Sequence, residues 1–144
     1  MIVALNVADG IVSYGILDVG DTNNTFDGNA IADTQLITSD ANVSINVLLR
    51  SSDAAAAGTP GVTDWALEGT IGADIFVHYY DLAADGSFVA FPFSGDFDNT
   101  NTTSVVTLAV KNDTAPLDLK IDMPSSTGDL TEHSIEVTAI ATAT

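Results

Sequence analysis

The chain has 144 residues, with 20 acidic side chains against 3 Lys or Arg, and its formal net charge is −17 at pH 7. This charge repels nucleic-acid phosphates, and no apolar run approaches the length of a membrane span, so we expect neither a nucleic-acid partner nor membrane insertion. The hydrophobic fraction of 46% is too high for intrinsic disorder, and the absence of cysteine excludes disulfides. We expect one domain spanning residues 1–144.

Short segments with alternating apolar and polar residues recur along the chain, and this period of two predicts β-strands. The clearest alternation lies in residues 43–50. Residues 74–81 are apolar on both faces, which predicts a central strand, and the Asp85-Gly86 pair that follows predicts a hairpin turn. In chain order, the predicted strands are residues 3–7, 11–17, 31–38, 43–50, 65–70, 74–81, 87–93, 104–110, 117–123 and 131–142.

Turn-forming residues separate these segments, and no stretch of ten or more residues has a helical period. The alanine run at residues 54–57 is expected to form one helical turn at most. The pattern therefore predicts an all-β fold, an antiparallel β-sandwich of jelly-roll or immunoglobulin-like type with roughly eight to eleven strands.

The acidic residues are mostly aspartates, 17 of the 20, and they gather in the predicted loops. The two richest loops are residues 18–27 and 96–101. Hard cations bind several oxygen ligands supplied by such loops, so calcium is the one candidate cofactor, although neither of these two loops has the EF-hand pattern. The alternative is a solvated turn that keeps the chain soluble. The candidate metal ligands are Asp18, Asp21, Asp27, Asp96 and Asp98.

Catalytic signatures are absent from the sequence. The two histidines, His78 and His133, are far apart, and there is no Gly-x-Ser-x-Gly motif, so we expect no enzyme. Trp65, Phe91 and Phe93 could form an aromatic platform for a sugar. The stronger alternative places them in the core, because a sandwich of this size needs its few aromatic side chains there.

Four Asn-x-Ser/Thr sequons mark candidate glycosylation sites, which matter only if the chain is exported through a glycosylating route. They begin at Asn23, Asn42, Asn101 and Asn112.

Three stretches together carry a family resemblance. They are residues 11–20 (IVSYGILDVG), residues 33–38 followed by 42–47 (DTQLIT, NVSINV), and residues 117–124 leading to 133–139 (LDLKIDMP, HSIEVTA). They resemble the opening hairpin, the paired strands around an Asn-rich turn and the closing strand pair of TasA/camelysin-like fibre proteins, a group that includes archaeal bundling pili. The usual Asn-x-Gly turn is replaced here by the sequence SDAN at residues 39–42.

The resemblance implies a secreted, extracellular or cell-surface subunit that polymerises head to tail with copies of itself by donor-strand exchange. The N-terminal segment of one subunit would complete a sheet of the next, and here that segment is residues 1–8. Its apolar residues at positions 3, 5 and 7 share one face and should fill pockets in the neighbour. The exchanged strand would comprise Ile2, Val3, Ala4, Leu5, Asn6 and Val7.

A second hypothesis is a carbohydrate- or calcium-binding β-sandwich module of a cell-surface protein. The two hypotheses make different structural predictions. Donor-strand exchange predicts that residues 2–7 leave their own fold, whereas the binding module predicts a compact monomer with an exposed aromatic or Asp-lined site. Pairing of residues 2–7 within their own subunit would favour the module.

Overall fold

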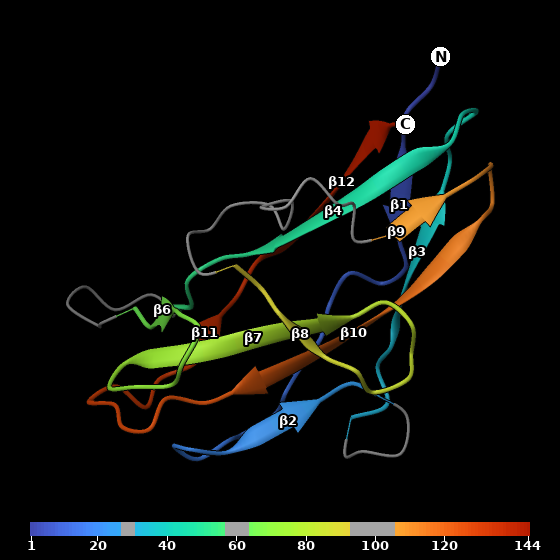
Figure 1. Ribbon diagram of the computed structural model, residues 1–144. Coiled ribbons are helices and arrows are strands. Elements are labelled where there is room, and N and C mark those ends of the chain that lie inside the picture. Colours follow the sequence, from blue (N-terminus) through green and yellow to red (C-terminus); the bar gives the residue numbers. More distant parts are fainter. Residues whose placement is uncertain (27–30, 57–63, 93–105) are drawn as a thin grey trace.

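The computed structural model describes residues 1–26, 31–56, 64–92 and 106–144. These residues form twelve β-strands and no helix, which confirms the predicted all-β fold (Figure 1). The count exceeds the expected eight to eleven because four of the strands are only two residues long. The strands are β1 (Leu5–Val7), β2 (Thr22–Asn24), β3 (Gln35–Ser39), β4 (Ile45–Ser51), β5 (Ala55–Ala56), β6 (Ala66–Leu67), β7 (Ile75–Asp81), β8 (Val89–Ala90), β9 (Val106–Leu108), β10 (Thr114–Asp122), β11 (His133–Ser134) and β12 (Val137–Ala143).

Two larger sheets pack against each other as a β-sandwich. The first has the strand order β1-β3-β10-β7-β6, with β2 also pairing with β10 and β8 with β7, and the second has the order β12-β4-β9. Figure 1 shows β4 and β12 running together in one layer and β7 and β10 in the other. The strands β5 and β11 form a separate short ladder. The choice between jelly-roll and immunoglobulin-like topology stays a prediction.

The nine-residue strand β10 organises the larger sheet. Its first half pairs with β3 and its second half with β2, while β7 pairs along its opposite side. Successive side chains of a strand point to opposite faces, so the buried residues at positions 115, 117, 119 and 121 face the core. The residues at positions 118, 120 and 122 therefore face outward.

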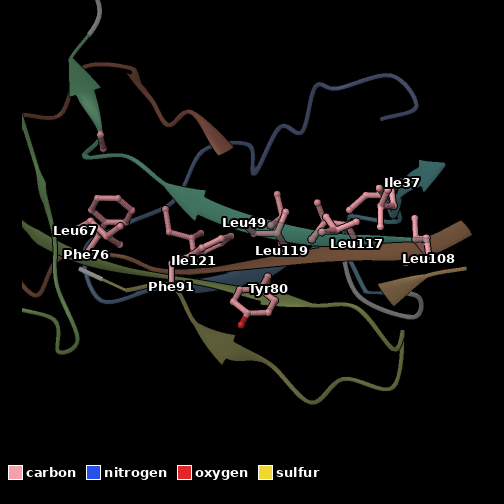
Figure 2. Packing of buried hydrophobic residues seen from close by; sticks show 14 of the residues in the cluster. Ile37, Leu49, Leu67, Phe76, Tyr80, Phe91, Leu108, Leu117, Leu119 and Ile121 are labelled. Carbon is pink, nitrogen blue, oxygen red and sulfur yellow. The ribbon is translucent and has the colours of Figure 1, made fainter. Parts of the chain in front are cut away.

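The core lies between the two sheets and is almost entirely aliphatic and aromatic (Figure 2). Each fully buried Leu, Ile or Phe side chain contributes about 1.5–3 kcal/mol relative to an exposed one. Both sheets supply these side chains, so each sheet buries its apolar face against the other. The labelled core residues are Ile37, Leu49, Leu67, Phe76, Tyr80, Phe91, Leu108, Leu117, Leu119 and Ile121.

Two predicted strands differ in the structure: residues 131–142 form two strands, β11 and β12, in separate ladders, and residues 11–17 form none. Residues 11–17 alternate as a strand would, and Val12, Tyr14 and Leu17 do pack on the core, but this segment pairs with no strand among the described residues. The alternation therefore reports burial rather than pairing. The alanine run was expected to form one helical turn at most; its residues Ala55–Ala56 form strand β5, which pairs with β11, and residue 57 lies outside the described residues.

The central-strand and hairpin predictions are confirmed. Strand β7 has neighbours on both sides, β10 on one and β6 and β8 on the other. The connection from β7 to the antiparallel strand β8 contains Gly86 with φ +80°, a backbone conformation that favours glycine.

Candidate functional site

The N-terminal strand β1 lies at an edge of the larger sheet of its own chain. It pairs antiparallel with β3, with Leu5 opposite Ser39 and Val7 opposite Ile37. Backbone hydrogen bonds extend this ladder at both ends, to residues 2 and 8. The structure therefore differs from the expectation that residues 2–7 leave their own fold, because the single chain completes its own sheet.

The side chains of this segment alternate as the sequence predicts. Val3, Leu5 and Val7 are half-buried and pack on the core, whereas Asn6 is exposed on the other face. The pairing of this segment with β3 therefore has a specific register, since a shift by one residue would move all three apolar side chains into water.

A sharp backbone turn follows β1. Asp9 has φ +63° and Gly10 has φ +75°, and the Gly10 amide donates to the Gln35 Oε1 atom at 2.9 Å. Positive φ is unusual outside glycine and marks a tight reversal of the chain. The turn separates β1 from residues 11–17, which pack against the core.

Residues 11–17 are held in place by a buried imidazole. His78 on β7 contacts the Ser51 hydroxyl through Nδ1 at 2.7 Å and the Tyr14 hydroxyl through Nε2 at 2.8 Å. Burial lowers the pKa of His78 from its ordinary value of 6.5 to about 3, and burial also raises the pKa of Tyr14. The imidazole is therefore neutral, and it joins the N-terminal segment to both sheets.

A serine beside a histidine invites comparison with a nucleophile and its base. Here the Ser51 and His78 side chains are each only 1% exposed, so no substrate can reach them from solvent. The arrangement is an internal crosslink that satisfies buried polar groups, which would otherwise destabilise the core.

The predicted metal ligands fall into two groups. Asp18 and Asp21 lie in one exposed turn, in which the Asp21 Oδ2 atom accepts the Asp18 amide at 3.0 Å. Asp27, Asp96 and Asp98 lie outside the described residues. Within the described part of the chain, no group of three or more His, Cys, Asp or Glu side chains could hold a metal ion.

The structure reveals one acidic pair that sequence reasoning missed. Asp81 on β7 and Asp118 on β10 are directly opposite each other in register, and they are 3% and 0% exposed. Aspartate is disfavoured inside strands, so its place between Leu117 and Leu119 was the signal available in the sequence. We call these two residues the Asp81–Asp118 pair.

The glycosylation candidates differ in accessibility. Asn23 is partly buried, and its amide donates to the Tyr14 carbonyl at 3.1 Å. Asn42 and Asn112 are exposed, the latter in a turn with φ +69°. Asn101 lies outside the described residues.

The aromatic residues do not form an exposed platform in the described structure. Trp65 is 6% exposed and Phe91 is 1% exposed, in agreement with the core alternative, while Phe93 lies outside the described residues. Trp65 stacks on His133 with ring centroids 3.7 Å apart. Its indole N–H donates to the Thr127 hydroxyl at 3.0 Å.

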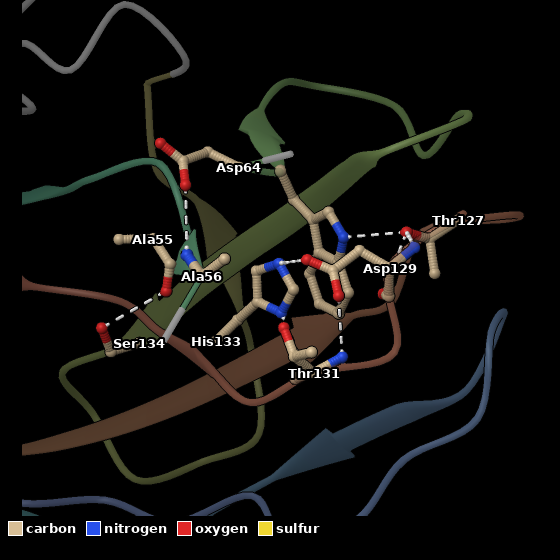
Figure 3. A network of polar contacts seen from close by, with 9 residues as sticks. Ala55, Ala56, Asp64, Thr127, Asp129, Thr131, His133 and Ser134 are labelled. Atoms are coloured by element: carbon tan, nitrogen blue, oxygen red, sulfur yellow. Dashed lines mark hydrogen bonds and ion pairs between the residues drawn. The ribbon is translucent and has the colours of Figure 1, made fainter. Parts of the chain in front are cut away.

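The same network contains a carboxylate beside His133. The Asp129 Oδ2 atom lies 3.5 Å from His133 Nε2 (Figure 3). Burial acts to raise the pKa of Asp129, but hydrogen bonds from Thr131 and the electrostatic attraction of neighbouring His133 outweigh it, so this pKa lies below its ordinary value. These contacts connect the loop of residues 127–132, which precedes β11, to Trp65.

The described residues contain no helix with the length and apolar character that a membrane span requires. Comparison of the chain with models of known protein families, with curated proteins and with solved structures finds no match.

Proposed function

We propose that the chain is a structural subunit of an extracellular filament, and that copies assemble head to tail by exchanging strand β1. The observation that carries the proposal is the edge position of the three-residue strand β1, whose Leu5 and Val7 side chains, with Val3 just before the strand, pack against the core. The turn at Asp9 and Gly10 comes directly after it. A short edge strand beyond a turn is an element that two copies can exchange at low cost.

The self-completed monomer sets the energetics of this assembly. When β1 leaves its seat, its three half-buried apolar side chains return to water, at a cost of a few kcal/mol. Insertion into the seat of a neighbour recovers the same contacts. Exchange therefore depends on protein concentration, and a head-to-tail contact that does not close into a ring extends into a filament.

One observation favours the alternative of a binding module, which is the pairing of β1 within its own chain. The carbohydrate form of this alternative is weakened because Trp65 and Phe91 are buried. The calcium form keeps support from the Asp81–Asp118 pair. The two proposals are separated by asking where β1 pairs when the protein is concentrated.

Engineered cysteines give that test, because the chain has none of its own. Asn6 and Thr38 are directly opposite on β1 and β3. We would mix a chain carrying N6C with a chain carrying T38C, concentrate them and oxidise. A disulfide between the two chains forms only if β1 of one copy pairs with β3 of another. We expect crosslinked species on a non-reducing gel, and filaments by negative-stain microscopy.

The matched control is a mixture of chains carrying N46C and T107C, which are opposite on β4 and β9 and belong to strands that are not exchanged. This mixture should give no crosslink between chains. Filaments without any N6C–T38C crosslink would refute strand exchange. A protein that stays monomeric at every concentration would refute the filament and leave the binding module.

A further inference from the structure

The Asp81–Asp118 pair buries two carboxylates on the outer face of the larger sheet. Residues directly opposite in an antiparallel pair have their Cβ atoms about 4.5–5.5 Å apart on the same face. Like charges in this arrangement repel each other, and burial weakens their solvation. Lys120 is the next residue on this face of β10, but its ammonium group pairs with Asp122 at 3.2 Å, and the other described ion pair, Asp129–His133, involves neither Asp81 nor Asp118.

The hydrogen bonds of the pair leave specific oxygen positions unused. Each carboxylate has about four lone-pair positions. The Asp81 carboxylate accepts three backbone amides: its Oδ1 takes residue 83 at 2.8 Å, and its Oδ2 takes residues 85 and 86 at 3.1 and 2.8 Å. In Asp118, Oδ1 accepts the Thr25 and Thr34 hydroxyls, but the buried Oδ2 has no hydrogen-bond partner.

We propose that the Asp81–Asp118 pair binds one hard divalent cation, and that calcium is the ion that fits it. The Asp118 Oδ2 atom offers two free lone pairs and the Asp81 Oδ1 atom offers one. Calcium accepts carboxylate oxygens in irregular geometry and completes its shell with water, whereas magnesium demands near-ideal octahedral geometry. Thr34 is exposed although its hydroxyl contacts Asp118, so solvent lies one side chain away from the site.

The small number of protein ligands sets the affinity. Two carboxylates, with the remaining ligands supplied by water, resemble the weaker class of calcium sites, with a Kd on the order of 0.1–1 mM. This site is separate from the Asp18–Asp21 turn. It also does not depend on filament formation, because all its contacts lie within one chain.

The test uses protein stripped with a chelator and titrated with calcium at constant ionic strength. For wild type we expect one saturable site by calorimetry and a rise in Tm of roughly 3–7 °C at ten times Kd. The variant Asp118→Asn should lose this response. The control Asp122→Asn removes the same charge from the same face of β10, about 13 Å away, and should keep it.

A second test of the calcium site compares the Tm of wild type with that of Asp118→Asn, with and without calcium. Without calcium, Asp118→Asn should melt above wild type, because it removes an uncompensated buried charge, and saturating calcium should reduce or reverse this difference. The proposal is overturned if Asp118→Asn responds to calcium like wild type, or if sodium chloride of equal ionic strength reproduces the shift in Tm.

Should Asp118→Asn fail to fold, amide NMR of the wild type locates the ion directly. Calcium should shift the amides of residues 83, 85 and 86, which are hydrogen-bonded to Asp81. Shifts concentrated in the Asp18–Asp21 turn, or no saturable shift at all, would refute the site. The measurement is made at concentrations at which the protein is monomeric, so its outcome is independent of strand exchange.

Discussion

Replacing the buried imidazole, as in His78→Gln, should change how stability depends on pH. Burial lowers the pKa of His78 to about 3 in the folded protein, against about 6.5 when the chain is unfolded. The unfolded state therefore binds the proton first as pH falls. The stability associated with neutral His78 is complete above pH 6.5 and is lost between pH 6.5 and 3.

The size of this loss follows from the linkage between protonation and folding. Each pH unit in that window lowers the free energy of unfolding by about 1.4 kcal/mol, or about 3 kcal/mol between pH 6.5 and 4. The many carboxylates oppose this trend, because acid reduces the self-repulsion of a chain with net charge −17. The useful quantity is therefore the difference between wild type and variant at each pH.

Urea unfolding followed by Trp65 fluorescence at pH 7, 6, 5 and 4 measures that difference. At pH 7, His78→Gln should be less stable by about 1–3 kcal/mol, because the hydrogen bonds to Ser51 and Tyr14 are disturbed. The gap should narrow as pH falls. The control His133→Gln removes the other imidazole. A gap that stays constant from pH 7 to 4, or one that narrows only in His133→Gln, would refute the reasoning.

Three further changes probe the edge strand, the crosslink and the core. Leu5→Asp should weaken filament assembly sharply in a sedimentation assay, because its charge enters an apolar seat, whereas Asn6→Asp on the exposed face should not; equal assembly of both would contradict the role of β1. Tyr14→Phe leaves a ring nitrogen of the buried imidazole unpaired and should cost about 1–3 kcal/mol in urea unfolding at pH 7, and an unchanged midpoint would show that this hydrogen bond contributes nothing. Leu49→Ala should cost about 2–5 kcal/mol, whereas Leu36→Ala at a 41% exposed position should cost far less, and similar losses would argue against the core described above.

The sequence predicts best those strands whose burial and pairing coincide. The alternation in residues 43–50 corresponds to β4, and the doubly apolar segment 74–81 corresponds to β7. Alternation fails for residues 11–17, because a segment can pack several apolar side chains against the core without a strand partner. The strand Thr22–Asn24 has no apolar residue and forms only because β10 offers it backbone partners.

The candidate sites depend on which residues of neighbouring strands lie opposite each other, and the sequence does not show this alignment. The predicted face of the N-terminal segment, with Val3, Leu5 and Val7 inward, is found in the structure because it follows from a period of two. The sequence could not show which strand would receive it. It also could not show that Asp81 and Asp118 face each other, because that requires the alignment of β7 with β10.

The pairing of early strands with late ones has a consequence for how the chain is made. Strand β2 pairs with the far end of β10, and β4 pairs along its length with β12. Loop-closure entropy must be overcome before such distant contacts form, so folding should be slow for the size of the domain, in the range of milliseconds to seconds. On the ribosome, β3 has no partner on its inner side until β10 emerges. The edge of β3 that pairs with β1 is therefore completed late. A nascent chain has no completed sheet edge with which the β1 segment of a neighbouring nascent chain on the same polysome could pair.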